Sequence, residues 1–177
     1  METNATDAVS VFDPTPSFVF PMRFLRALPV LLLAFVTPLL HAQREKFSTE
    51  DLEYIEKTWP DAKKTNTGIR YVILKEGESG APSPKPGNWV SVLYVGKLLR
   101  GQQFESLQDR EHPFKFRVAR ESVIEGWDQV LVMMKRGEKR LVIIPPELAY
   151  GSRGQLPKIP RNAALVFEIE LIEISTD

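Results

Sequence analysis

The sequence predicts an α+β protein in which an antiparallel sheet of five to six strands wraps around one short helix, with a further short helix before the sheet. Two observations predict this class. Several runs within residues 68–174 alternate apolar and polar side chains, which is typical of strands with one buried face. Only one stretch among them, residues 122–134, has apolar residues at helical spacing. Half-buried strands with one helix between them indicate an antiparallel sheet packed on that helix.

Composition excludes several classes of function. The chain has 177 residues, with 23 basic and 23 acidic side chains, so it lacks the basic excess of a nucleic-acid-binding protein. It contains no cysteine, which excludes disulfides, thiol nucleophiles and cysteine metal sites. Its 2 histidines lie far apart in the sequence. We therefore expect no metal site, no cofactor and no Ser-His-Asp arrangement.

Residues 22–42 have the pattern of a signal peptide. Arg23 and Arg26 precede an apolar run, residues 27–40, and Ala42 offers a small residue before a cleavage point. The sequence thus predicts an exported, periplasmic protein. Two alternatives stay open: the run is an uncleaved inner-membrane anchor, or it is a buried helix. Its shortness and its two prolines disfavour a membrane span.

A signal peptide normally begins the chain, and this one would follow residues 1–21. We interpret those residues as an upstream extension or a disordered tail, with Met22 as the alternative start. Contact with a membrane is expected only if the leader is not cleaved.

The next segment, residues 43–67, contains a predicted helix at 49–58. Ser48 or Thr49 can cap its start, and Pro60 ends it. One face of this helix carries the apolar residues Leu52, Ile55 and Trp59. This face should pack either on the following domain, residues 68–177, or on a second copy of the chain.

Five runs in residues 68–177 are predicted strands, and residues 77–87 between the first two form a Pro-, Gly- and Ser-rich loop. The runs are 68–77, 88–104 with a turn at 100–102, 113–118, 137–146 and 164–174. The last shows the clearest alternation, with Leu165, Phe167, Ile169 and Leu171 on one face. The alternation slips at Glu173, which predicts a frayed or bulged end.

The helix predicted within residues 121–137 contains an unusual Gly126–Trp127 pair near its start. Ser122 and Glu125 have the spacing of a capping box, and Gly137 suits the helix exit. An apolar stripe along its buried side comprises Trp127, Val130, Leu131 and Met134. Glycine lowers helix stability by about 1 kcal/mol relative to alanine, so we interpret Gly126 as making room for the indole.

Several segments of the chain, in order, resemble the FKBP-type peptidyl-prolyl isomerases. They are "LYVGKL" (93–98), "GQQFES" (101–106), "HPFKFRV" (112–118), "SVIEGWDQVL" (122–131), "GEKRLVIIPPELAYGSRG" (137–154) and "IPRNAALVFEIELIEI" (159–174). The resemblance covers about residues 68–175. It implies a sheet wrapped around a short helix, with an aromatic-lined substrate pocket between them.

The resemblance implies two groups of site residues. The catalytic group comprises Tyr94, Phe104, Glu105, Trp127, Tyr150 and Phe167. The substrate-binding group comprises Arg110, Phe114, Val123, Ile124 and Ile159. Trp127 would form the pocket floor beneath the proline ring. Tyr150 and the backbone N–H of Ile124 would bind substrate carbonyls, and Arg110 would hold acidic and tyrosine side chains near the pocket.

Three positions are compared with the family pattern, and one of them, Gln155, occupies a variable position and carries little information. Glu105 stands where the family usually has aspartate, which we expect to change macrolide affinity more than proline turnover. Lys158 occupies a commonly apolar position and should alter the pocket rim.

The resemblance implies a peptidyl-prolyl cis–trans isomerase that assists the folding of exported proteins. Its ligands would be proline-containing polypeptides and macrolide inhibitors. Rotation about an X–Pro bond breaks no covalent bond, so it needs no nucleophile. The alternative is a chaperone module that binds proline segments with low turnover, tethered to a membrane if the leader stays. Oligomeric state, client proteins and the residue preferred before proline stay open.

Overall fold

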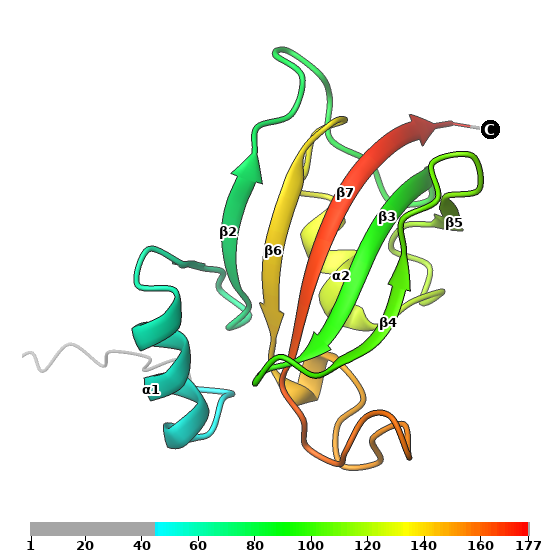
Figure 1. Ribbon diagram of the computed structural model, residues 1–177. Coiled ribbons are helices and arrows are strands. Elements are labelled where there is room, and N and C mark those ends of the chain that lie inside the picture. Colours follow the sequence, from blue (N-terminus) through cyan, green and yellow to red (C-terminus); the bar gives the residue numbers. More distant parts are fainter. Residues whose placement is uncertain (1–44, 177) are drawn as a thin grey trace, which may run out of the picture. The chain divides into compact units, whose positions relative to one another are not determined.

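The computed structural model describes residues 45–176 (Figure 1), so the predicted extension (1–21) and signal peptide (22–42) lie outside the described residues. The elements are α1 (Thr49–Thr58), β1 (Lys63–Lys64), β2 (Arg70–Lys75), β3 (Trp89–Leu98), β4 (Gln103–Leu107), β5 (Phe114–Arg117), α2 (Glu125–Leu131), β6 (Lys139–Ile144), the 3₁₀ helix η1 (Pro146–Leu148) and β7 (Leu165–Ser175). No helix within residues 45–176 has the length and apolar character needed to cross a membrane.

The strands form one antiparallel sheet, which confirms the predicted α+β class. Its order is β1-β2-β6-β7-β3-β4, and β5 pairs with the other part of β3, which makes 7 strands among the described residues. The strand that the sequence did not predict is the two-residue β1, which pairs with β2. Too short to show any alternation, β1 has no recognisable sequence pattern.

The predicted slip at the end of β7 is a β-bulge. Ser91 of β3 lies opposite Glu173, whereas the next residue, Val92, lies opposite Leu171, so Ile172 is the extra residue. Before the bulge, Leu165, Phe167, Ile169 and Leu171 all lie in the core, at most 3% exposed. The extra residue returns Ile174 to the core face, where it packs against the same cluster.

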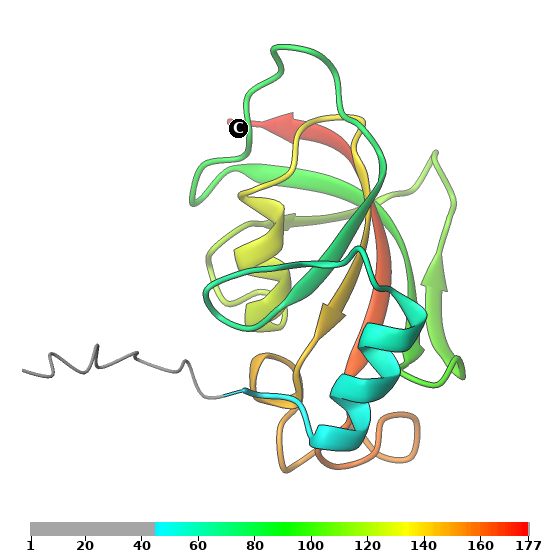
Figure 2. The same cartoon turned by 90° about the vertical axis from the view of Figure 1, so that its left-hand side faces the viewer.

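The two helices cover opposite faces of the sheet, as alternate residues of β6 show (Figure 2). Val142 and Ile144 pack in the core that contains α2, while Ile143 between them packs in the cluster that contains Ile55 of α1. Ile55 is 1% exposed. The apolar face of α1 therefore packs on the domain of the same chain, the first of the two predicted alternatives. As expected, the Ser48 hydroxyl caps α1 by accepting the Asp51 N–H at 3.1 Å.

The helix α2 is shorter than the sequence predicted, and two predictions about its ends are wrong. Its N-cap is Ile124, with no side-chain cap, so Ser122 does not cap it. The Asp128 carboxylate instead accepts the N–H groups of Ala119 and Glu121, which bends the chain before the helix. Its C-cap is Val132, and Gly137 (φ +79°) lies in the turn that enters β6.

The structure gives Gly126 a role toward the sheet. A β-carbon at Gly126 would lie 2.5 Å from Cγ2 of Ile144, so the missing side chain makes room for β6. The glycine lets the first turn of α2 lie directly against the sheet.

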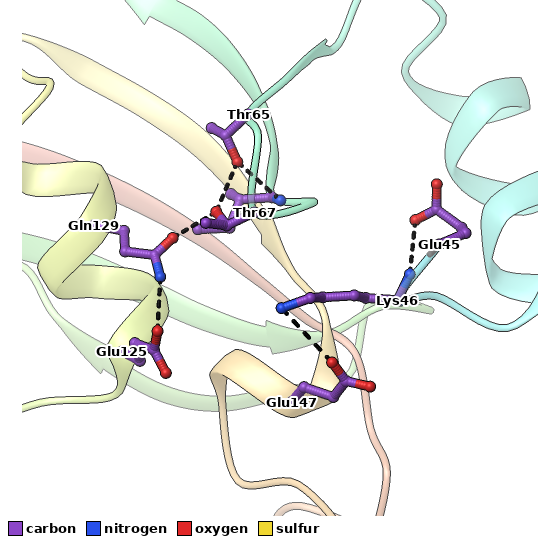
Figure 3. A network of polar contacts seen from close by, with 8 residues as sticks. Glu45, Lys46, Thr65, Thr67, Glu125, Gln129 and Glu147 are labelled. Atoms are coloured by element: carbon purple, nitrogen blue, oxygen red, sulfur yellow. Dashed lines mark hydrogen bonds and ion pairs between the residues drawn. The ribbon is translucent and has the colours of Figure 1, made fainter. Parts of the chain in front are cut away.

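A chain of polar contacts joins the segment before β2 to α2 (Figure 3). The Thr67 hydroxyl donates to the Gln129 side-chain oxygen, and the Gln129 amide donates to Glu125 at 2.8 Å. The Thr65 hydroxyl contacts that of Thr67 at 3.0 Å and accepts the Ile69 N–H. Residues 65–67 therefore fix the solvent-facing side of α2.

Candidate substrate-binding pocket

An aromatic pocket of about 260 Å³ lies between α2 and the sheet. Its lining residues are Tyr94, Glu105, Phe114, Ser122, Val123, Ile124, Trp127, Tyr150, Gln155 and Phe167. They come from β3, β4, β5, β7 and α2, from the segment just before α2, and from the loop between η1 and β7. Thus elements distant in the sequence converge on one small volume.

Trp127 is the centre of the aromatic cluster. Its ring lies 4.9 Å from that of Tyr94 and 5.3 Å from that of Phe167, both nearly perpendicular to it. The Phe114 ring lies 6.3 Å away at 72°. Edge-to-face pairs of this kind are favourable because the positive edge of one ring meets the negative face of the other. These contacts hold the indole in place.

Two predicted pocket residues lie behind the lining. Phe104 packs edge-to-face on Phe167, with ring centroids 5.7 Å apart. Both rings lie over Gly96, where a β-carbon would come within 2.8 Å of each. Ile159 is 1% exposed and belongs to the core. Phe104 and Ile159 therefore support the wall and do not form its surface.

The polar side chains of the pocket are Glu105, the two tyrosines Tyr94 and Tyr150, Ser122 and Gln155. Burial, the negative charge of Glu105 and a hydrogen bond to that carboxylate raise the pKa of Tyr94 to about 12. Burial and the same charge also raise the pKa of Tyr150. Both tyrosine hydroxyls therefore keep their protons at neutral pH. That of Tyr94 donates to Glu105, and that of Tyr150 can donate to a ligand.

Two N–H groups at the helix start have no partner among the described residues. The carbonyl of Ile124 accepts the backbone N–H groups of Trp127 and Asp128. The N–H of Ile124 donates to no described group. The indole N–H of Trp127 is buried and also unpaired. Buried donors are nearly always paired, so an unpaired one at a pocket is a candidate ligand contact.

Arg110 is not a pocket residue in this structure. Its guanidinium donates to both carboxylate oxygens of Glu170, at 2.8 and 2.9 Å. It lines a second hollow of about 350 Å³, which shares Tyr94 with the aromatic pocket and includes Lys97, Lys139 and Glu168 among others. Among the described residues, Arg110 makes no hydrogen bond or ion pair with an acid or tyrosine of the aromatic pocket. The loop after β4 places it beside Glu170 instead.

Sequence reasoning missed two lining residues, Ser122 and Gln155. The capping pattern points to a helix cap for Ser122, and Gln155 lies in a loop where no periodicity identifies it. The only available signal was their position beside residues of the family motif. Residues 45–176 contain no cluster of His, Cys, Asp or Glu able to hold a metal ion.

Residues 80–172 match the family described as FKBP-type peptidyl-prolyl cis-trans isomerase. The match covers more than half of the chain, and together with the fold and the pocket it shows that the chain belongs to this family. The class of reaction is therefore rotation about the peptide bond that precedes proline.

Curated relatives and solved structures agree with this assignment. FK506-binding protein 1A of Aspergillus fumigatus is 41% identical over 102 residues, which cover 58% of this chain and 91% of the relative. Human peptidyl-prolyl cis-trans isomerase FKBP4 is 46% identical over 110 residues, 62% of this chain but 24% of the human protein.

Two solved bacterial structures are similar to the chain. The crystal structure of FkpA from Escherichia coli aligns with a TM-score of 0.63 at 37% identity, covering 72% of this chain and 58% of that one. A Pseudomonas syringae peptidyl-prolyl cis-trans isomerase aligns with a TM-score of 0.62 at 36% identity, covering 71% and 91% respectively.

Proposed function

We propose that the pocket catalyses X–Pro rotation by binding the twisted amide, without a covalent intermediate. The barrier of about 18–20 kcal/mol comes from the amide resonance lost on twisting. An apolar site lowers it by disfavouring the charge-separated planar forms more than the twisted form. The observation that supports this proposal is the aromatic pocket around Trp127, which combines an apolar wall with a few donors.

Each group in the pocket has a separate role in this proposal. Trp127 receives the proline ring on an apolar surface. The Tyr150 hydroxyl and the Ile124 N–H bind carbonyls on either side of the rotating bond. Glu105 accepts from Tyr94 and keeps that ring in place.

A protease-coupled tetrapeptide assay tests the catalytic proposal. Tyr150→Phe should lower kcat/KM by about 2-fold to 10-fold, because one neutral hydrogen bond contributes about 0.5–1.5 kcal/mol. Tyr54→Phe removes a hydroxyl from α1, outside the pocket, and should leave kcat/KM unchanged. If the unaltered chain gave no rate enhancement but bound proline peptides, the low-turnover chaperone would replace the isomerase.

The setting we propose is the folding of exported proteins in the periplasm. The supporting observation is the leader pattern of residues 22–42. Intact-mass measurement of the protein from its native host should show loss of all residues through Ala42. A full-length mass in the membrane fraction would instead support the anchor at residues 27–40.

FK506-class macrolides are the proposed inhibitors, because relatives at 41–47% identity are named FK506-binding proteins. Glu105 places its carboxylate one methylene beyond that of the usual aspartate. Glu105→Asp should therefore change macrolide affinity more than kcat/KM for peptides. Equal changes in the two quantities would contradict this role of Glu105.

A further inference from the structure

A short hairpin, residues 155–159, forms one rim of the pocket. Gln155 and Ile159 exchange backbone hydrogen bonds of 2.8 and 2.9 Å, so residues 156–158 form its tip. Gln155 lines the pocket and Ile159 is buried in the core, which anchors both ends. Leu156 at the tip is 66% exposed. A firmly held hairpin thus presents an apolar side chain to solvent beside the site.

The loop around this hairpin carries three exposed cations, Arg153, Lys158 and Arg161. Backbone contacts fold the loop on itself: the Asn162 N–H donates to the Gly151 carbonyl at 2.8 Å, and the Gly154 N–H donates to the Tyr150 carbonyl at 3.1 Å. These contacts hold the backbone of the cation-bearing loop beside the pocket residue Tyr150.

No acidic residue compensates this charge. The sequence contains none between Leu148 and Phe167. Within the described part of the chain, none of the three cations has an ion pair. Some other surface cations do have partners: Arg100 pairs with Glu50 at 2.7 Å, and Lys64 with Glu45 at 2.8 Å. This rim therefore carries an uncompensated positive charge.

We propose that this rim selects proline-containing segments with an acidic residue next to the X–Pro pair. The proposal rests on the proposed catalytic function and names its substrate class. An acidic flank would lie over Arg153, Lys158 and Arg161, while an adjacent apolar side chain packs on Leu156. Glu105 inside the pocket repels a carboxylate there, so the acidic residue belongs outside the X–Pro pair.

The test uses two series of peptides, which vary the residue before X or the residue after proline as Glu, Gln or Lys. A protease-free assay of cis-to-trans relaxation gives kcat/KM. At one flank at least, kcat/KM for the Glu peptide should exceed that for the Lys peptide by about threefold to tenfold at low salt, as expected for several exposed charge pairs. The ratio should approach one in 0.5 M salt, since the screening length is then only about 4 Å.

Charge reversal provides the matched comparison. The triple variant Arg153→Glu, Lys158→Glu, Arg161→Glu should invert the preference. The control triple variant Lys57→Glu, Lys63→Glu, Lys75→Glu has the same change in net charge at exposed positions on α1, β1 and β2, and should retain it. The salt dependence of the unaltered chain tests the proposal even if the first triple variant does not fold.

Each outcome decides one point. Equal kcat/KM for Glu and Lys peptides at both flanks would overturn this proposal and leave the isomerase intact. If the control variant also inverted the preference, net charge would be its cause, and the proposed role of the rim would be overturned. Failure to isomerise any peptide would instead refute the proposed catalytic function.

Discussion

Gly126 of α2 lies directly against Ile144 of β6: a β-carbon on the glycine would be 2.5 Å from Cγ2 of the isoleucine. Ile144 is fully buried and its Cγ2 branches from the β-carbon, so it cannot rotate away easily. This contact fixes how closely the helix approaches the sheet. Since Trp127 is the next residue, the same contact sets the depth of the pocket floor.

Gly126→Ala should destabilise the protein although alanine favours helices. The propensity gain of about 1 kcal/mol opposes an overpacking cost of about 1–3 kcal/mol. The clash should dominate because Ile144 is enclosed on all sides. Urea unfolding measures the net loss. Adding Ile144→Val should not relieve it, because valine retains both branches at the β-carbon, whereas adding Ile144→Ala should remove the clash. A double variant Gly126→Ala, Ile144→Ala whose loss equals the sum of the single losses would contradict this explanation.

Trp127→Ala should reduce both stability and activity. Truncating a buried large aromatic costs about 3–5 kcal/mol, and the proline ring loses its proposed support. Chemical denaturation and kcat/KM below the unfolding transition measure the two effects. Trp89, which is 39% exposed, provides the control, because Trp89→Ala should change neither greatly. Full activity of a folded Trp127→Ala protein would show that the pocket is not the site.

The titration of Tyr94 should depend on Glu105. The Tyr94 pKa is raised to about 12 by burial, by the charge of Glu105 and by their hydrogen bond. The folded state therefore holds this proton more firmly than the unfolded state, whose tyrosines titrate near pH 10. The resulting stability is fully present below about pH 10 and is lost as the pH rises through about 12.

Glu105→Gln should lower the Tyr94 pKa part of the way toward 10, since burial persists. Ultraviolet absorbance after rapid pH jumps, with Tyr94→Phe as the subtraction, measures the pKa. Glu111→Gln changes an exposed acid outside the pocket and is the control. A Tyr94 pKa unchanged by Glu105→Gln would mean that Glu105 does not interact with it.

Ile55→Ala should lower stability without changing the pocket. Truncating a buried isoleucine to alanine lowers the free energy of unfolding by about 2–5 kcal/mol. Ile55 is 1% exposed and packs on the sheet face opposite α2. Thermal unfolding should show the loss, while kcat/KM at low temperature stays constant. Glu56→Ala at the exposed neighbouring position should affect neither. A large fall in kcat/KM for folded Ile55→Ala would indicate coupling between the two faces.

The sheet was largely predictable because its signals are local. In β7, alternation identified the buried face, and its slip at Glu173 located the bulge at Ile172. The ends of α2 were not predictable in this way. Ser122 and Glu125 satisfied a capping pattern, but Asp128 binds the preceding N–H groups and Ile124 becomes the N-cap.

In the pocket, too, the sequence predicted most of the residues involved but not the direction of every side chain. Trp127, Tyr94, Phe114 and Phe167 were expected by resemblance and do converge. Arg110 was expected there too, yet it pairs with Glu170, because the direction of a loop side chain depends on its neighbours in space. Whether these residues act on substrate stays a prediction.

The sequence by itself determined the α+β class, the strand faces and the family, because each depends on residue order along the chain. Only the tertiary structure decided where α1 packs, what Gly126 accommodates and which side chains line the pocket. Those depend on contacts between segments far apart in the sequence, such as Gly126 with Ile144 and Ile55 with the cluster around Ile143. Periodicity shows that a face is buried, but it carries no information about the partner that covers it.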